Sequence, residues 1–355
     1  MFLDWNVAIL KSSSTKHIES ETLSYVIKYI TQAIKNPRTY SIINPLLPEL
    51  LTNYVFPLLF ITQADALEWD ENPDEFTRKM YDISPIFYTP RTAALDMITI
   101  ACSHLPPAPK GIVKKTPDSH PILTQFIQFL LKILAESDNS AQINVRAIDS
   151  AFLALGSLVD EIEKFPSISG ELEGILKQFV LKQFKNQIGF VRMRACWVYG
   201  QFYELEFKDV EAFKVAIQCV FEALSDSDLP VRVVAAVSLH KFLDNNVIVD
   251  MLRPVLAELL TIYLKLMNEI ELEELVFGLE QLVKAYGDEI KPFALRLTQE
   301  LVDAFKRMSA PTSDEDIPDS ALAASACVDT INKIIQMLGP SSPEIIDQIE
   351  PVSTK

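Results

Sequence analysis

The chain has 355 residues, a mass of 40.0 kDa and a formal net charge of −16 at pH 7. It contains only 9 glycines, far fewer than an average usage of about 7% would supply. This scarcity disfavours enzymes built on glycine-rich phosphate loops and favours a helical protein. The negative charge argues against direct nucleic-acid binding, which needs basic residues to replace phosphate counterions. Two interpretations of the acidity remain open: solubility, or attraction of basic proteins.

The N-terminus and the cysteines bear on the cellular compartment. A signal peptide is not expected, because the first ten residues run into Lys11 and a serine run, and the apolar run YVFPLLFI is too short to cross a bilayer. The four cysteines are widely spaced, form no C-x-x-C pair and predict buried thiols in a reducing compartment; they are Cys102, Cys196, Cys219 and Cys327. We therefore expect a cytosolic or nuclear protein without membrane insertion.

The first distinctive segment in chain order is EWDENPDEFTRKMYDI, residues 68–83. Its acids could form a catalytic cluster or a hook for cargo, but local chemistry favours the start of a helix. Asn72 can serve as N-cap, Pro73 suits the first helical position, and Glu75 follows three residues after the cap. The segment therefore predicts a helix that begins near residue 73.

Three later segments can be superimposed on a Val-Arg pair followed by small residues. Their arginines are Arg146, Arg192 and Arg232, spaced by 46 and 40 residues, and a weaker copy contains Arg91. This spacing is typical of HEAT and armadillo repeats, whose antiparallel helix pairs stack into a superhelix. We predict an all-α protein, a right-handed α-solenoid of HEAT repeats, in which Arg232 pairs with an acidic residue of a neighbouring turn and holds one repeat on the next.

The whole chain is predicted to form a single repeat array. Proline and polar residues divide it into seven helical units, at about 1–62, 74–104, 121–164, 171–206, 210–245, 250–308 and 319–338. The segments between and after them are predicted to be a proline-rich loop at 105–121, an acidic loop at 309–320 and a tail at 339–355.

Motifs for catalysis or cofactor binding are not found. The sequence has no phosphate loop, dinucleotide-binding fingerprint, zinc-protease motif, serine-hydrolase elbow or calcium loop. The acidic loop carries Asp314, Glu315, Asp316 and Asp319, whose spacing differs from that of a calcium loop. We expect no enzyme activity, no cofactor and no metal, and only an electrostatic role for the acidic loop.

Two segments carry a resemblance to a known family. Trp69, Pro73, Glu75, Phe76 and Arg78 match the W-x-x-x-P-x-E-[FY]-x-R segment of the importin-β superfamily of nuclear transport receptors. The segment QIGFVRMRACWVYGQF is similar to the R-A-R-A-C-W-V segment of that family, and the repeat around Arg232 is similar to the one after it. The matching residues there are Arg192, Arg194 and Trp197. The sequence resembles the importin seven and eight branch, with the exportin that recycles importin α as the nearest competitor.

The resemblance implies a function in binding. In this family, cargo lies on the concave face of the superhelix, phenylalanine-glycine (FG) repeats of the nuclear pore dock between outer helices, and Ran with GTP releases cargo in the nucleus. The resemblance assigns the acidic loop to contacts with cargo or Ran and implies basic cargo such as ribosomal proteins or histones. It also implies shuttling between cytoplasm and nucleus. Because receptors of this family are much longer, we expect an internal fragment or a short relative. The alternative is a HEAT scaffold without a transport role.

Overall fold

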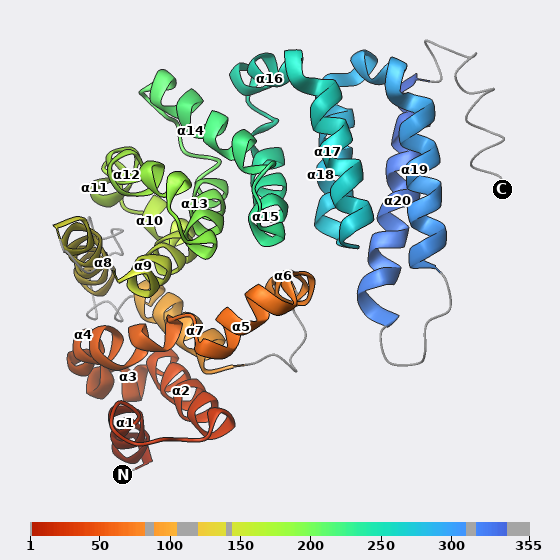
Figure 1. The fold of residues 1–355 in the computed structure, drawn as a ribbon. Helices are drawn as coiled ribbons and strands as arrows, with labels where there is room; N and C mark the ends of the chain where they lie inside the picture. The colour runs from red at the N-terminus through yellow and green to blue at the C-terminus, as the bar shows by residue number, and fades with distance from the viewer. Residues whose placement is uncertain (1, 82–88, 105–119, 140–143, 310–316, 339–355) are drawn as a thin grey trace. The chain divides into compact units, whose positions relative to one another are not determined.

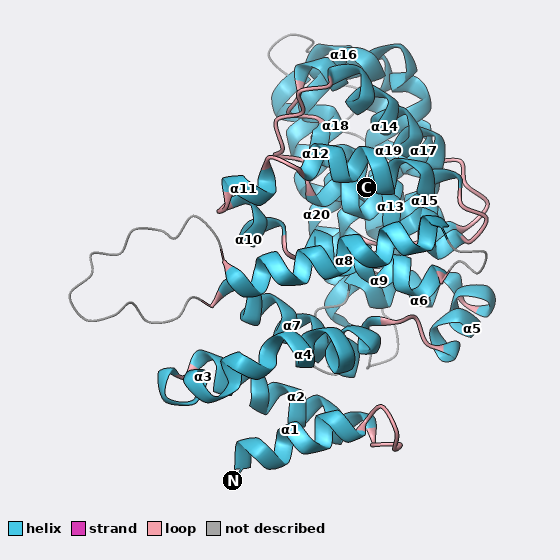
Figure 2. Cartoon of the chain, turned by 90° about the vertical axis from the view of Figure 1, so that its left-hand side faces the viewer, coloured by secondary structure: helices cyan, strands magenta, loops and turns pink. Residues whose placement is uncertain are grey.

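A computed structural model describes residues 2–81, 89–104, 120–139, 144–309 and 317–338. Helices and the loops joining them make up this part of the chain, and no strand occurs in it (Figure 2). The chain divides into two compact units, unit 1 at Met1–Lys208 and unit 2 at Asp209–Lys355. The proline-rich loop at 105–119, most of the acidic loop and the tail lie outside the described residues.

Unit 1 is built from helices of very different length, from the short α4 to the long α8 (Figure 1). Its α-helices are α1 (Phe2–Ser12), α2 (Ser20–Lys35), α3 (Pro37–Ile43), α4 (Leu47–Leu50), α5 (Gln63–Glu71), α6 (Pro73–Tyr81), α7 (Pro90–Ser103), α8 (Pro121–Asn139), α9 (Val145–Ser157), α10 (Val159–Glu163), α11 (Pro166–Ser169), α12 (Leu172–Ile175) and α13 (Gly189–Gln201). Tighter or wider helical turns extend α3, α4 and α12, namely η1 (Asn44–Leu46), η2 (Leu51–Val55), η3 (Phe56–Leu59), η5 (Leu176–Val180) and η6 (Leu181–Lys185).

Unit 2 is built in the same way from helix pairs. It contains α14 (Val210–Ala223), α15 (Leu229–Leu239), α16 (Asn246–Leu252), α17 (Leu256–Glu269), α18 (Glu273–Tyr286), α19 (Ala294–Met308) and α20 (Ile317–Leu338), with short 3₁₀ segments η7 (His240–Phe242), η8 (Arg253–Val255) and η9 (Gly287–Phe293). The last residues of the predicted acidic loop, 317–320, are helical and open α20.

Packing between successive helix pairs makes each unit a solenoid. In unit 1, α2 packs on α7, α7 on α9 and α9 on α13, and α8 covers α9 from the other side. In unit 2, α15 packs on α18 and α18 on α20, while α14, α17 and α19 each pair with the helix that follows. The predicted all-α solenoid of helix pairs is thus confirmed, whereas its handedness and the division into seven units stay predictions.

Small residues allow these helices to approach closely. Ala93 and Ala94 on α7, Ala195 and Cys196 on α13, and Ala235 and Ala236 on α15 are fully buried. They follow the arginines that define the sequence repeat, so the repeat marks the helix faces that pack on the neighbouring pair. Because an alanine or cysteine leaves room for a neighbouring helix, these positions set the close spacing of the inner helices.

The stretch Pro37–Glu71 is long and apolar enough to cross a membrane by length and composition alone. In the structure it is broken into short helical pieces with prolines at 45, 48 and 57. Leu47, Leu50 and Val55 of this stretch are fully buried, whereas Ile42 and Leu67 are more than half exposed, and its segments pack on α7 and α8. This stretch is accounted for as part of the core of unit 1.

Candidate functional site

The tryptophan segment joins two parts of unit 1. The Trp69 ring on α5 lies 5.1 Å from the ring of Phe76 on α6 and 6.4 Å from that of Phe190 at the start of α13, both in edge-on geometry. Such pairs add to the gain from burying the rings. Phe76 is buried. The family signature therefore includes a packing contact between the α5–α6 hairpin and a later repeat.

The other signature residues of this segment define a helix boundary. α5 ends at Glu71 and α6 begins at Pro73, and the backbone carbonyl of Asn72 accepts the Phe76 N–H at 3.0 Å. Glu75 is exposed and lies 3.6 Å from Lys79, which also pairs with Glu68. Arg78 is half-buried on α6. The predicted helix start at residue 73 is confirmed, and the acids of this segment pair with a lysine instead of converging on a catalytic site.

A buried carboxylate connects three successive inner helices of unit 1. Asp149 on α9 is fully buried; its Oδ2 accepts from Nη2 of Arg91 on α7 at 3.2 Å, and its Oδ1 accepts from Nε of Arg194 on α13 at 2.8 Å. Burial lowers the pKa of Arg91, and the Asp149 charge opposes that shift. One negative charge between two positive charges leaves this triad with a net charge of +1.

Arg194 and Trp197 extend the triad along α13. The Arg194 guanidinium lies 5.1 Å from the centre of the Trp197 ring. That ring covers Gly156 of α9 so closely that a Cβ at residue 156 would approach the Trp197 Cη2 atom to 2.9 Å. Both residues of the second family segment therefore hold α13 against α9. Arg194 pairs with Asp149, and the Trp197 ring packs on Gly156.

Two of the repeat arginines make equivalent contacts. Arg192 Nη1 donates to the carbonyl oxygens of Asn186 and Gln187 at 2.9 and 3.2 Å. Arg232 Nη1 donates to those of Asp226 and Ser227, both at 3.0 Å. Each arginine thus satisfies carbonyls in the turn that precedes its own helix.

Arg232 also pairs with an acidic residue of the next helix pair, as expected from the sequence. Its Nη2 pairs with Glu269 at the end of α17, in the next helix pair of unit 2. Arg146 differs from this pattern: it is exposed and has no hydrogen-bond or ion-pair partner among the described residues. The sequence repeat therefore does not imply one uniform arginine ladder. Asp149, which joins Arg91 and Arg194, was not identified from the sequence. The one sequence feature that could have pointed to it is an acidic residue within an apolar helix.

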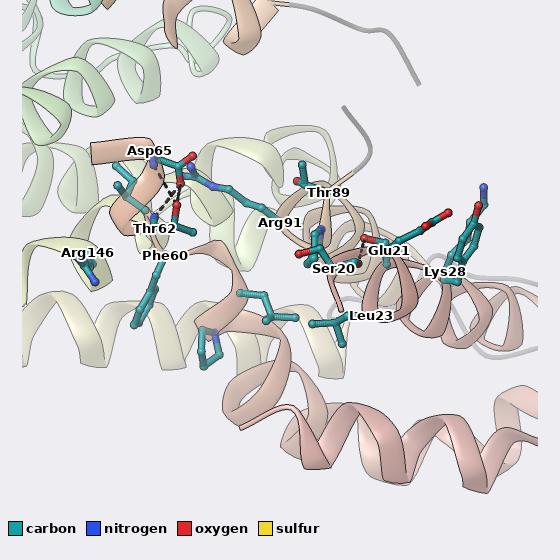
Figure 3. Close-up of a pocket in the computed structure, with 16 residues that line it drawn as sticks. Ser20, Glu21, Leu23, Lys28, Phe60, Thr62, Asp65, Thr89, Arg91 and Arg146 are labelled. Atoms are coloured by element: carbon teal, nitrogen blue, oxygen red, sulfur yellow. Dashed lines mark hydrogen bonds between the residues drawn. The ribbon is translucent and has the colours of Figure 1, made fainter. Parts of the chain in front are cut away.

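A groove of about 1010 Å³ opens in unit 1 where several helices begin (Figure 3). The starts of α2 and α7, the segment that follows η3, and Arg146 of α9 line it. Figure 3 shows the Arg91 side chain extending toward Thr62 and Asp65. The Asp65 carboxylate accepts from the backbone N–H and hydroxyl of Thr62, both at 2.8 Å, and so caps α5.

Several acids of unit 2 lie in or next to the turns inside its helix pairs. Asp226 and Asp228 lie in the turn before α15. Around the turn between α17 and α18, Glu269 ends α17, Glu271 lies in the turn, and Glu273 and Glu274 begin α18. The predicted loop residues Asp314, Glu315 and Asp316 lie outside the described residues, and Asp319 lies in the first turn of α20, whose side chains there are also not described.

The cysteines and potential metal ligands suggest no chemistry in the described part of the chain. Cys102, Cys196 and Cys327 are buried and Cys219 is half-buried, all as free thiols. Burial raises the pKa of Cys327 to about 11, so that thiol is unreactive near neutral pH. The described residues contain no group of three or more His, Cys, Asp or Glu side chains arranged to hold a metal ion.

Comparison with known proteins identifies relatives along almost the whole chain. It is 35% identical over 339 residues to the importin beta-like SAD2 homolog of Arabidopsis thaliana, a match that covers 94% of this chain and 32% of the relative. It is 29% identical to the probable importin-7 homolog of Dictyostelium discoideum, covering 92% of this chain and 30% of that protein. No family model matches the chain. The chain spans about a third of the length of these relatives.

Solved structures agree in fold. Yeast importin-β, Kap95p, matches 96% of this chain and 38% of its own with a TM-score of 0.57 at 12% identity. A second Kap95p structure, in which its binding induces the switch loops of RanGDP to adopt the GTP-bound conformation, gives a TM-score of 0.52 at 12% identity. These likenesses concern the α-solenoid alone. The sequence relatives show that this chain belongs to the importin-β superfamily. Within that superfamily, its relatives include importin-7 and importin-8 homologues.

Proposed function

We propose that this chain is a segment of a nuclear transport receptor of the importin type. It binds basic protein cargo, FG repeats of the nuclear pore, or both, and Ran regulates cargo release in the intact receptor. The observation that carries the proposal is the 35% identity to an importin beta-like protein over 94% of the chain. On this proposal the protein shuttles between cytoplasm and nucleus and has no enzymatic activity.

Charge supports the proposal of basic cargo and assigns it to unit 2. Residues 209–355 contain 12 Lys and Arg against 25 Asp and Glu, a net charge of −13. Residues 1–208 contain 20 against 23, a net charge of −3. A concentrated negative field speeds the encounter with a positive partner and favours correct over incorrect partners. Unit 2 is therefore the proposed surface for ribosomal proteins or histones.

The acidic loop is the proposed contact within unit 2. Asp314, Glu315, Asp316 and Asp319 place four negative charges within six residues. The loop lies between α19 and the body of α20, in the same kind of position as the acidic turn between α17 and α18. We propose that it contacts basic cargo, or Ran in the intact receptor.

A binding experiment with matched variants tests this proposal. Purified core histones or basic ribosomal proteins are titrated against the chain at low and moderate salt. The variant with Asp314, Glu315 and Asp316 changed to serine is compared with a control that changes the exposed acids Asp70, Glu71 and Asp74 of unit 1 to serine. The loop variant is expected to bind about tenfold more weakly at low salt, because three attractive charges are lost, and the control is expected to bind normally.

The two possible failures are distinguishable. Equal affinity of the loop variant and the control would reject the loop as a contact. If the unmodified chain bound none of the basic proteins at low salt, basic-cargo binding by this segment would be rejected.

A further inference from the structure

The groove in unit 1 combines positive charge with apolar surface, in contrast to the acidity of the protein as a whole. Its cationic side chains are Lys28 on α2, Arg91 on α7 and Arg146 on α9. They come from three helices and line one groove of about 1010 Å³, with Arg146 and Lys28 at opposite ends (Figure 3). In a chain with a net charge of −16, this is a local reversal of sign.

The acids of the groove are already engaged or lie at a helix start. Asp65 accepts two hydrogen bonds from Thr62 in the cap of α5. Glu21 lies in the first turn of α2, where a negative charge complements the helix dipole. The positive charge of the groove is therefore not fully balanced within the groove itself.

The buried triad behind the groove adds no further net charge, because the charges of Asp149 and Arg194 are opposite. Arg91 lines the groove and is one quarter exposed, while Asp149, its partner, is shared with Arg194. Besides Asp149, the nearby charge of Asp65 also acts on the Arg91 guanidinium. Arg146, at the other side of the groove, is exposed and has no ion-pair partner among the described residues. An anion in the groove would therefore meet one partly neutralised arginine and one unpaired arginine.

Apolar side chains are accessible beside these charges. Leu58 and Phe60 are half-buried in the segment around the end of η3, and the Tyr25 side chain on α2 is 62% exposed. All three line the groove. An apolar side chain that covered them would remove apolar surface from water, which favours binding. The groove can therefore contact an anionic group and an apolar group of the same ligand.

We propose that this groove binds a peptide segment in which acidic side chains stand next to apolar ones. Arg146 and Arg91 hold the carboxylates, and Leu58, Phe60 and Tyr25 cover the apolar side chains. The volume is at the upper end of the range of about 300–1,000 Å³ for small-molecule sites, which leaves room for several side chains of a peptide. The surface is separate from the acidic turns of unit 2 and does not depend on the function proposed above.

Fluorescence anisotropy of labelled peptides tests the proposal on the full chain. Three fluorescein-labelled peptides of equal length are used, in which Leu alternates with Glu, with Gln or with Lys. The variant Arg146→Glu is compared with Arg38→Glu, a matched charge reversal at an exposed arginine of α3 that does not line the groove. Both positions are exposed, so both variants are expected to fold, and circular dichroism checks this.

The Leu-Glu peptide is expected to bind about tenfold more tightly than the Leu-Gln peptide, because the latter lacks carboxylates for Arg146 and Arg91. Arg146→Glu is expected to weaken binding of the Leu-Glu peptide about tenfold by the same reasoning, whereas Arg38→Glu leaves it within a factor of about two. Tyr25→Ser is expected to weaken the Leu-Glu and Leu-Gln peptides equally, because it removes apolar contact only.

Three results would overturn the proposal. The first is equal affinity for the Leu-Glu and Leu-Gln peptides or tighter binding of the Leu-Lys peptide. The second is an equal effect of Arg146→Glu and Arg38→Glu. The third is displacement of the Leu-Glu peptide by inorganic phosphate at the same concentration as by unlabelled peptide, since the groove would then be a simple anion site.

Discussion

The two units use the same helix pairs but hold them together differently. In unit 1, a fully buried carboxylate, Asp149, joins three inner helices through Arg91 and Arg194. In unit 2, the links between pairs are more exposed, such as Arg232 with Glu269, or are tyrosine hydroxyls that donate to backbone carbonyls. Unit 1 is also nearly neutral, whereas unit 2 carries a net charge of −13.

This difference shows how one repeat can serve two purposes. A buried ion triad is sensitive to the loss of one partner, because the remaining charges are left without compensation. Exposed pairs contribute little and are screened by salt. The packing of the helices in unit 1 is thus fixed by a buried ion triad. The charges of unit 2 lie at the surface, where a partner can bind them.

The largest expected effect comes from breaking the triad. Asp149→Ala leaves the guanidinium groups of Arg91 and Arg194 close together without their shared carboxylate. We expect unit 1 to lose about 3–5 kcal/mol in free energy of unfolding. All three tryptophans, Trp5, Trp69 and Trp197, lie in unit 1, so tryptophan fluorescence during denaturant unfolding measures this loss for unit 1 alone.

Glu49→Ala is the control for that prediction. Glu49 pairs with Lys11 at 2.7 Å in unit 1, with both side chains at least one third exposed. Its removal is expected to change stability by less than about 1 kcal/mol. Equal effects of the two substitutions would show that the buried triad has no special role.

A glycine-to-alanine substitution beneath an aromatic ring is expected to destabilise the protein less than Asp149→Ala does. Each unit offers one such glycine. Gly156→Ala forces a Cβ against the Trp197 ring, and Gly278→Ala places one 2.6 Å from Cε1 of Tyr263, which is fully buried. Each change is expected to cost about 1–3 kcal/mol. Gly156→Ala should shift the tryptophan transition, whereas Gly278→Ala should shift only the part of the circular dichroism transition that tryptophan does not report. Gly174→Ala, where no atom lies within 4 Å of the new Cβ, serves as the unstrained control.

Acid pH is expected to weaken unit 2 through His240. Burial lowers the pKa of His240 from 6.5 to about 4, and its Nδ1 atom has no hydrogen-bond partner in the part of the chain that the structure describes. The unfolded chain therefore takes up a proton below pH 6.5 that the folded chain refuses until about pH 4. The stability due to neutral His240 is complete above pH 6.5 and is lost as the pH falls toward 4.

The variant His240→Gln isolates this contribution, because glutamine does not titrate. Compared with the variant, the unmodified chain should lose about 3 kcal/mol more between pH 7 and pH 4, measured by circular dichroism. The tryptophan transition reports unit 1, which contains the buried His120, hydrogen-bonded at both nitrogens. Because both proteins retain His120, this transition should be the same in both. An equal pH dependence of the two proteins would contradict the assignment to His240.

The smallest expected effect is at the exposed link of unit 2. Glu269→Gln removes the charge opposite Arg232, which still donates to the carbonyls of Asp226 and Ser227. We expect a loss below about 1 kcal/mol that disappears at high salt. A loss as large as that of Asp149→Ala, or one that persists at high salt, would remove the contrast between the two units.

The architecture could be predicted from the sequence because the residues that indicate it lie close together along the chain. The spacing of Arg146, Arg192 and Arg232 and the small residues after each of them are visible along the chain, and they define the packed helix faces. The helix start at Pro73 was predictable for the same reason. The resemblance also identified the superfamily, because Trp69 and Phe76 stand at a fixed spacing within one segment.

The candidate site was less predictable because it depends on tertiary contacts. Asp149 is 58 residues from Arg91 and 45 from Arg194, and nothing in a single sequence pairs them. Arg146 shares its motif with Arg192 but is exposed instead of bonding to a turn. The groove gathers residues from position 20 to position 146, so its mixture of positive and apolar groups appears only in three dimensions.

Hydrogen exchange with and without a bound core histone tests the central claim most directly. The full chain is mixed with the histone at low salt, and amide protection is mapped by mass spectrometry. The account predicts new protection in unit 2, in the acidic turns between α17 and α18 and before α20, and predicts that moderate salt removes it. Protection confined to unit 1, or protection that is unchanged by salt, would contradict the proposal that the acidic unit receives basic cargo.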